Sequence, residues 1–367
     1  WNLIAEIETF RGCPRWITGG CSFCIEPKYG QVVYRDPNAI AREVETLYKC
    51  GVNSFRLGRQ PDILSYMAEG ANEVEFPRPN VEALKSLFES IRYAAPGLHV
   101  LHIDNVNPGT IAHHPEESRE ALKVIVENHT PGDVAALGIE SADQKVVKLN
   151  NLKATPEEAF EAIKLINEVG SRRGWNGMPE LLPGINFVLG LRGETKESYV
   201  LNLKFLRRVT EEGLLVRRVN IRQVLALPGT GMWDVGNKIA VAHKRYFQSF
   251  KRKVRREFDR PMLMRVVPYG TLLRDLFVEA HEGRYSLARQ VGSYPLLIYI
   301  PEKLEVKTKL DSIVVKHGYR SVKGVPYPLN VNTASRESLS LVPGMTQKGV
   351  VKIQAKRPFK SLEELKR

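Results

Sequence analysis

The sequence predicts an α/β fold, because short apolar runs alternate with helical patterns through the first two thirds of the 367 residues. Six runs have the length and composition of strands: 3–7, 53–57, 98–103, 134–139, 184–189 and 218–225. Five helical patterns separate them: 37–49, 80–94, 115–128, 155–169 and 194–212. Repeated strand–helix units are typical of a parallel sheet covered by helices, which forms either a barrel or an open doubly wound sheet. In both architectures the functional groups collect at the carboxyl ends of the strands.

The first helical pattern has clear boundary signals. Asp36 can accept hydrogen bonds from the free N–H groups of the first turn, and Pro37 suits the first helical position. Cys50 follows the pattern directly, and we expect it to be a small buried hydrophobe. His102 alternates with apolar neighbours in the third strand, so we expect a core histidine there.

Three of the four cysteines lie within twelve residues, directly after the first strand: Cys13, Cys21 and Cys24. Three thiolates would leave one iron of a four-iron cube without a protein ligand, and an open coordination site is where a metal performs chemistry. Glycines at 12, 19 and 20 let the backbone fold tightly around a bulky cluster. A zinc site of three cysteines and a histidine is the alternative, although the nearest histidine, His99, belongs to a later strand. A disulfide framework is disfavoured, because the sequence has no secretory signal.

With Phe23 directly before the last cysteine, this loop resembles that of the radical S-adenosylmethionine (SAM) family. The family pattern spaces its cysteines by three and then two residues, whereas the first gap here is seven. The resemblance implies a [4Fe–4S] cluster, SAM, and reductive cleavage of SAM to a deoxyadenosyl radical. It also implies a partial (β/α)6 TIM-like barrel over residues 1–240.

The strand ends extend this resemblance, and in the family these positions approach SAM. The second strand ends in an Arg-Leu-Gly-Arg-Gln segment, the fourth in Gly-Ile-Glu-Ser, and the fifth in an apolar-Gly-x-x-Gly-Glu-Thr turn. The resemblance therefore implies a set of cofactor-binding residues: Phe23, Gly58, Arg59, Gln60, Glu140, Ser141, Leu189, Gly190 and Val224. Asp104, at the end of the third strand, is a weaker candidate. No residue is assigned a catalytic role.

Residues 241–328 are expected to form a basic helix and a small β-rich module, loosely similar to the small barrel of related RNA-modifying enzymes. Between 243 and 260, aromatic residues recur at helical spacing among many lysines and arginines. The basic face is either solvated or directed at phosphate groups. A net charge of +13 favours a polyanionic partner, although basic surfaces also occur in heat-adapted proteins.

Residues 329–367 resemble a helix-hairpin-helix module of DNA-binding proteins, with Thr333 or Ser335 capping its first helix. Its hairpin would expose N–H groups to a phosphate at the start of the next helix. The candidate contacts are Pro343, Gly344, Met345, Thr346 and Lys348, and protein docking is the alternative role. The helical pattern still runs at Arg367 and the chain begins with Trp1, so both ends look cut.

The leading hypothesis is a radical SAM enzyme that modifies a nucleic acid, whether tRNA, rRNA or DNA, and takes electrons from a donor such as ferredoxin or flavodoxin. The whole arrangement is similar to an uncharacterised, mainly archaeal set of radical SAM enzymes with a C-terminal helix-hairpin-helix. Radical chemistry on a peptide or small molecule and a non-catalytic iron–sulfur nucleic-acid-binding protein remain alternatives. No apolar stretch is long enough to span a membrane, and a cytoplasmic location is expected. The oligomeric state stays open.

Overall fold

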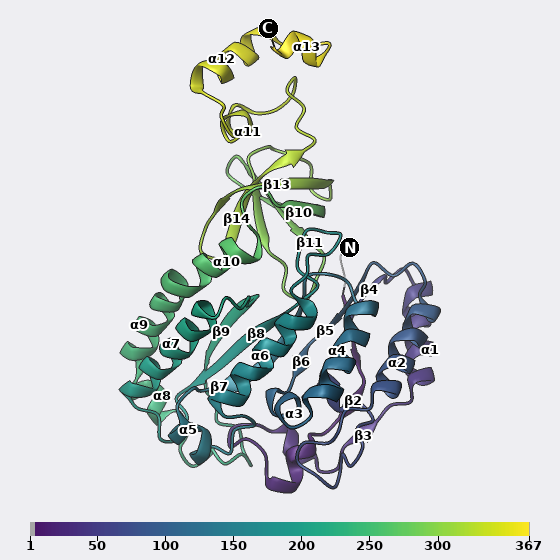
Figure 1. The fold of residues 1–367 in the computed structure, drawn as a ribbon, viewed down its shortest axis with the longest axis vertical. Helices are drawn as coiled ribbons and strands as arrows, with labels where there is room; N and C mark the ends of the chain where they lie inside the picture. Colours follow the sequence, from purple (N-terminus) through teal and green to yellow (C-terminus); the bar gives the residue numbers. More distant parts are fainter. Residues whose placement is uncertain (1–3, 367) are drawn as a thin grey trace. The chain divides into compact units, whose positions relative to one another are not determined.

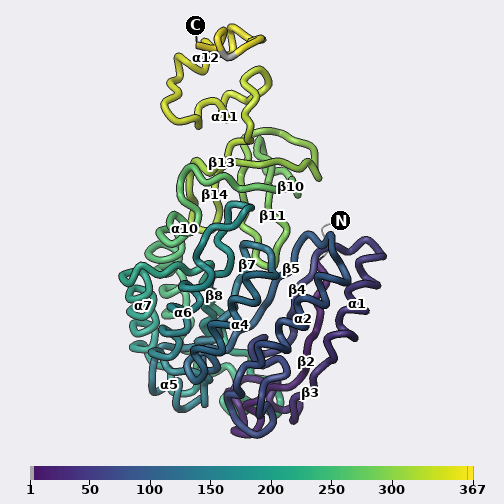
Figure 2. The backbone as a smooth tube through the Cα atoms, turned by 45° about the vertical axis from the view of Figure 1, so that its right-hand side comes forward, coloured from purple at the N-terminus to yellow at the C-terminus, as the bar shows by residue number. Residues whose placement is uncertain are grey.

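The computed structural model describes residues 4–366, which divide into two compact units (Figures 1 and 2). The first unit contains the chain up to Gly174, together with Pro179–Met262 and Gly292–Tyr294. The second contains Trp175–Met178, Leu263–Val291 and the chain from Pro295 onward.

The first unit is built on parallel strands that follow one another in sequence order. One sheet has the order β1 (Ala5–Glu8), β4 (Ser54–Gly58), β5 (Val100–Ile103). The next has the order β6 (Asn105–Val106), β7 (Asp133–Glu140), β8 (Leu181–Leu189), β9 (Arg218–Gln223). Only Asp104 separates β5 from β6, and its carbonyl accepts a hydrogen bond from Ala136 N at 2.8 Å. The predicted α/β class is confirmed, with a TIM-like sequence of parallel strands.

Helices between the strands lie along the sheet (Figure 1), and the residues that they bury are mostly apolar. They are α1 (Pro37–Lys49), α2 (Val81–Ala94), α3 (Pro108–His113), α4 (Pro115–Asn128), α5 (Gln144–Leu149), α6 (Pro156–Gly170) and α7 (Lys196–Glu211). Asp36 accepts hydrogen bonds from Asn38 N and Ala39 N, so α1 begins where its cap predicts. Thr155 and Glu158 form a capping box that starts α6.

The prediction that Cys50 is buried is wrong. Cys50 is exposed and forms the carboxyl cap of α1, where its N–H bonds to the carbonyls of Thr46 and Leu47. The following Gly51 has φ of +91°, so the chain turns away from the helix at this point. Position at a helix end therefore outweighed the usual tendency of cysteine to be buried.

The two faces of the sheet differ in polarity. In β8 and β9 the buried residues Ile185, Phe187, Val219 and Ile221 alternate with partly exposed ones, as a period of two requires. The partly exposed positions are Asn186, Val188, Arg218 and Asn220. The partly exposed face of these two strands therefore carries polar side chains at three of its four positions.

A basic helical segment completes the first unit. It comprises α8 (Lys238–Ala242), α9 (Lys244–Val254), a π-helical turn (Arg255–Asp259) and the start of α10 (Arg260–Val266). Helix α9 buries Phe247, Phe250 and Val254, while its lysines and arginines are exposed. The predicted amphipathic basic helix is therefore present.

The second unit contains a closed five-stranded barrel. Its strands are β10 (Leu272–Glu282), β11 (Tyr285–Gln290), β12 (Leu297–Ile300), β14 (Ser321–Tyr327) and β13 (Lys309–His317), in that spatial order. Three short helices follow: α11 (Arg336–Ser340), α12 (Gln347–Lys356) and α13 (Leu362–Lys366). Their small core consists of Ala334, Leu339, Val350 and Ile353. Among residues 4–366, no helix is long and apolar enough to cross a membrane.

Candidate functional site

The three cysteines lie on a loop that extends from the carboxyl end of β1 through the two-residue strand β2 (Phe10–Arg11). Cys13 directly precedes a 3₁₀ turn, η1 (Pro14–Thr18), and Cys24 N donates to the Cys21 carbonyl at 3.0 Å. Gly20 has φ of +65°, and a Cβ at this position would overlap the ring of Pro27. Glycine is therefore required for the close turn that leads into Cys21.

Burial raises the pKa of all three thiols, and nearby negative charge adds to the effect. Burial, to which the neighbouring Cys21 and Cys24 add, raises the pKa of Cys13 to about 12, against the opposing effect of a backbone hydrogen bond from Arg15. Burial likewise raises the pKa of Cys21 and of Cys24, and Lys153 opposes the increase at each cysteine. The thiols therefore share one electrostatic environment, in which deprotonation requires a positively charged partner such as a metal.

No three His, Cys, Asp or Glu side chains of residues 4–366 converge on a single metal ion. An iron–sulfur cube attaches each thiolate to a different iron, so its ligands need not meet at one point. The set of neighbouring thiols, with Cys21 buried and Cys13 and Cys24 partly buried, therefore fits a cluster.

Arg15 contacts the cysteine loop from within and was not anticipated from the sequence. Its side chain is only 3% exposed, and Nη1 donates to Cys21 Sγ at 2.9 Å. Nε donates to Glu75 Oε1 at 2.6 Å, and Nη2 donates to Asn151 Oδ1 at 3.1 Å. The guanidinium therefore joins a candidate metal ligand to two distant segments of the chain.

Two adjacent asparagines after α5 fix the backbone of the same loop. Asn151 Nδ2 donates to the carbonyls of Thr18 and Gly20 at 3.1 and 3.0 Å. Asn150 is fully buried, and its Oδ1 accepts from Ser22 Oγ at 2.7 Å. Asn150 Nδ2 also donates to the Arg192 carbonyl at 2.8 Å, so the turns after α5 and β8 both hold the loop.

An apolar cluster surrounds two of the cysteines. Cys21 packs with Val146, Val147, Leu152, Leu191, Val224 and Met232, and Phe23 and Cys24 lie against this cluster. The structure thus brings together two predicted cofactor residues, Phe23 and Val224, with the cysteine loop. Apolar side chains therefore pack around Cys21 and against Cys24 on this side of the loop.

Glu140 and Lys153 form a buried ion pair beside the thiols. Glu140 ends β7 with φ of +62° and is 4% exposed, and Lys153 Nζ lies 3.4 Å from its Oε1. Burial raises the pKa of Glu140, against the opposing effect of Lys153. Burial lowers the pKa of Lys153, but Glu140 and the three thiols outweigh it and leave that pKa raised. A Cβ at Gly138 would overlap both charged atoms, so this glycine makes room for the pair.

The end of β4 places Gln60 with one polar atom unsatisfied. Gln60 is 1% exposed, and its Nε2 donates to the Leu57 carbonyl at 3.0 Å. Its Oε1 is buried without a hydrogen-bond partner among residues 4–366. Such an atom is costly unless a ligand satisfies it. Arg59, with φ of +65°, acts electrostatically on Glu26 of the turn that follows the cysteines.

The remaining predicted cofactor residues have local structural roles. Ser141 Oγ accepts a hydrogen bond from Asp143 N at 3.1 Å, and a Cβ at Gly58 would overlap the Glu6 carboxylate. Leu189 is buried, and its carbonyl accepts from Val224 N at 2.8 Å. Gly190 has φ of +94°, and its N–H donates to Glu194 Oε2 at 2.7 Å.

Asp104 and His102 are both engaged by the segment Gly292–Tyr294 of the same unit. Tyr294 OH donates to Asp104 Oδ1 at 2.9 Å, and Ser293 N donates to His102 Nδ1 at 3.1 Å. His102 is 2% exposed, which confirms the expectation of a core histidine.

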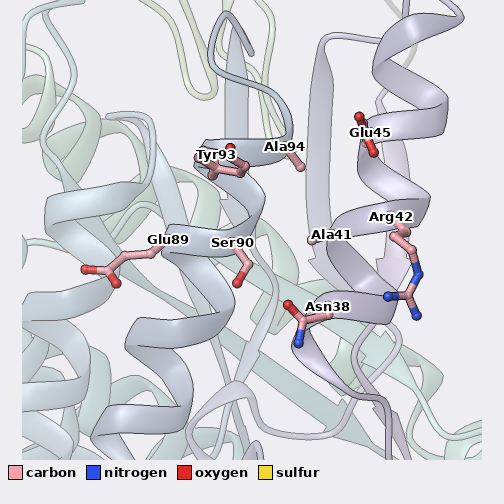
Figure 3. A pocket seen from close by; sticks show the side chains of 8 residues that line it. All are labelled: Asn38, Ala41, Arg42, Glu45, Glu89, Ser90, Tyr93 and Ala94. Carbon is pink, nitrogen blue, oxygen red and sulfur yellow. The ribbon is translucent and has the colours of Figure 1, made fainter.

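Figure 3 shows a separate groove between α1 and α2, of about 470 Å³. Its lining residues are Asn38, Ala41, Arg42, Glu45, Glu89, Ser90, Tyr93 and Ala94. None of them belongs to the cysteine loop or to the strand ends described above. The groove is formed by two helices alone, so it does not coincide with the candidate site.

The predicted phosphate contacts lie at the start of α12. Pro343, Gly344, Thr346 and Lys348 are exposed, and Met345 packs on the small helical core. Thr346 is the amino cap of α12, since its Oγ1 accepts from Gly349 N at 3.0 Å. Threonine at this position therefore stabilises the helix start directly.

Comparison with known proteins identifies a family and several relatives of this chain. The profile of the family described as "Radical SAM superfamily" matches residues 7–206. An uncharacterised protein of Archaeoglobus fulgidus is 47% identical over 99% of this chain and 67% of its own length. An uncharacterised protein of Methanocaldococcus jannaschii is 49% identical over 88% of this chain and 60% of its own length.

A more distant relative has a named activity. A tRNA-2-methylthio-N(6)-dimethylallyladenosine synthase of Azobacteroides pseudotrichonymphae is 25% identical over 55% of this chain and 39% of its own length. The chain thus spans about two thirds or less of the length of these three relatives.

Proposed function

The chain belongs to the radical SAM superfamily, whose enzymes use a [4Fe–4S] cluster and SAM, and we propose that Cys13, Cys21 and Cys24 bind that cluster. The observation that supports this assignment is the gathering of the three thiols, with Cys21 buried and Cys13 and Cys24 partly buried, close enough to Lys153 to raise its pKa. When bound, the cluster supplies one electron to the sulfonium of SAM, which breaks the bond between sulfur and C5′ and yields methionine and a deoxyadenosyl radical.

We assign the SAM site to the strand ends next to the cysteine loop, within a six-stranded partial barrel. Gln60 offers a buried oxygen that can accept a hydrogen bond from the amino group of the methionine moiety. Lys153, whose side chain is partly exposed, holds a positive charge beside Glu140 and the thiols, where it offsets the negative charge of the loaded site. Phe23, Leu189 and Val224 supply the apolar surroundings that keep water out.

The catalytic half of the proposal is tested by anaerobic reconstitution with iron and sulfide, followed by incubation with SAM and dithionite. We expect 5′-deoxyadenosine from the wild-type chain and from C50A, because Cys50 is exposed and lies outside the loop. C21A should bind little iron and release none of this product. A cluster-loaded wild-type chain that leaves SAM intact would refute the proposal.

We further propose that the substrate is a nucleic acid, with tRNA favoured by the activity of the Azobacteroides relative. The main structural support is α9, which contains no acidic residue and exposes Lys244, Arg245, Lys251, Arg252 and Lys253. Such density of positive charge suits a phosphate backbone. We propose three domains: the barrel over 1–240, the basic helix and β-rich module over 241–328, and a helix-hairpin-helix over 329–367. The turn before α12, in the last of these, is a second candidate contact for phosphate. An external ferredoxin or flavodoxin would supply electrons in the cytoplasm.

Salt-dependent binding tests the nucleic-acid half. The triple variant K251Q/R252Q/K253Q should reduce the slope of log K against log salt by roughly 2 for single-stranded RNA, since each lost phosphate contact contributes about 0.7. The control variant K85Q/K123Q/K164Q removes the same charge from the exposed faces of α2, α4 and α6 and should leave the slope unchanged. Equal slopes for both variants would argue against α9 as a phosphate site. If the affinity of the wild-type chain for RNA does not change with salt concentration, a peptide or small-molecule substrate would be favoured.

A further inference from the structure

The seven residues between Cys13 and Cys21 do more than connect two ligands. They form η1, which places Arg15 with its side chain almost fully buried. The guanidinium contacts Cys21 Sγ through Nη1, Glu75 through Nε and Asn151 through Nη2. All three nitrogens are thus engaged, and each partner comes from a different segment of the chain.

Three properties make this contact electrically important. Arginine stays protonated in proteins, so its positive charge is permanent. Burial reduces solvent screening, so the charge acts strongly on the sulfur that it touches. Hydrogen bonds to ligand sulfurs and the local net charge are both factors that set the reduction potential of an iron–sulfur cluster. A fixed cation at Cys21 favours the reduced state, because reduction adds negative charge.

We propose that Arg15 is a positioning residue that raises the reduction potential of the cluster by donating a hydrogen bond to Cys21. This inference rests on the proposed function, since it requires Cys21 to be a cluster ligand. The electron comes from an external one-electron donor, and no bond forms or breaks in that step. Glu75 lies on the far side of the guanidinium and partly neutralises it, so the two residues act in opposite directions.

Opposite charge changes therefore predict opposite shifts. In R15Q the sulfur loses a charged donor, and at a fixed solution potential the ratio of reduced to oxidised cluster should fall at least tenfold. For a one-electron couple, a tenfold change corresponds to about 59 mV. In E75Q the guanidinium keeps its contact with Cys21 and loses its counterion, so the same ratio should rise. R15K keeps the charge but not the three-way contact and should lie between wild type and R15Q.

The experiment is an anaerobic redox titration of the full chain, followed by electron paramagnetic resonance of the reduced cluster, with iron content measured for each variant. A negative shift for R15Q and a positive shift for E75Q would support the inference. Unchanged potentials, or shifts of the same sign, would overturn it, because a merely structural loop contact affects cluster loading and not the sign of the potential. If R15Q loads too little iron to titrate, the shift of E75Q alone decides.

Failure of this inference is distinguishable from failure of the proposed function. A wild-type chain that loads a cluster and cleaves SAM, with variants that titrate alike, would overturn only the role of Arg15. A wild-type chain that binds no cluster would overturn both.

Discussion

Replacement of Lys153 by Met should destabilise the chain strongly, because it leaves Glu140 buried without a counterion. Lys153 Nζ and Glu140 Oε1 lie 3.4 Å apart, and the side chains are 21% exposed for Lys153 and 6% exposed for Glu140. At an effective dielectric constant of about 20, that distance gives roughly 5 kcal/mol of attraction. Desolvation of both groups offsets part of it, and loss of one partner of a buried pair costs about 3–5 kcal/mol. Since Lys153 keeps some contact with solvent, we expect a loss of about 3 kcal/mol at pH 7.

The pH dependence of stability provides a second, independent test of this prediction. The pKa of Glu140 is already raised by burial, and removal of Lys153 raises it further. A carboxyl whose pKa is higher in the folded chain binds more protons there, so acidification stabilises the folded state. Relative to wild type, K153M should therefore recover up to about 1.4 kcal/mol per pH unit as pH falls below the pKa of Glu140 in the folded variant.

Urea unfolding of the cluster-free chain at pH 7 and pH 5.5 measures both effects. K123M is the matched control, because Lys123 and Glu120 form a similar pair at 2.8 Å with both side chains half exposed. That surface pair should contribute less than about 1 kcal/mol at either pH. The reasoning fails if the free energy of unfolding of K153M lies within about 1 kcal/mol of the wild-type value at pH 7, which is no more than a surface pair contributes. It also fails if the difference between K153M and wild type is the same at both pH values.

Three further outcomes are expected. C13A, C21A and C24A should each lose bound iron in a colorimetric assay while C50A keeps it, and full loading of any loop variant would contradict the assigned ligands. Q60L should leave the urea midpoint unchanged or slightly higher, because it removes a buried unsatisfied oxygen, yet weaken SAM at least tenfold in calorimetry; unaltered SAM affinity would exclude Gln60 from the site. His129 lies 3.1 Å from Asp133 and 3.6 Å from Glu180, and although burial lowers its pKa, these carboxylates leave that pKa raised. The ion pairs of His129 should stabilise the chain fully below about pH 6.5, and this stabilisation should disappear as pH rises through the raised pKa of His129. In H129Q the urea midpoint should therefore vary less with pH over that range than in wild type. An unchanged pH profile would contradict this prediction.

Local signals in the sequence determine much of the fold. Helices α1 and α4 span Pro37–Lys49 and Pro115–Asn128, as predicted. Caps act within one turn, so Asp36 and Thr155 can be recognised without knowledge of the tertiary structure. The prediction that Cys50 is buried was wrong, because burial depends on what packs against the end of a helix and not on residue type alone.

The sequence pattern predicts the cysteine ligands that we propose, whereas the charged groups around them could not be predicted. The spacing of Cys13, Cys21 and Cys24 is visible in twelve residues, whereas Arg15 reaches partners 60 and 136 positions away. Lys153 gains its role only because β7 ends with Glu140 in a left-handed conformation. Gly138, within an otherwise apolar strand, was the one available sign of a close approach at that point.

The asparagines that hold the cysteine loop have a consequence for biosynthesis. Asn150 and Asn151 bond to residues 128 to 133 positions earlier in the chain. A ribosome must therefore make about 130 further residues after the cysteine loop before its thiols can reach their final arrangement, and until then they remain open to oxidation. Iron delivery to this protein is thus expected to follow translation of this part of the first unit, under conditions that keep the waiting thiols reduced.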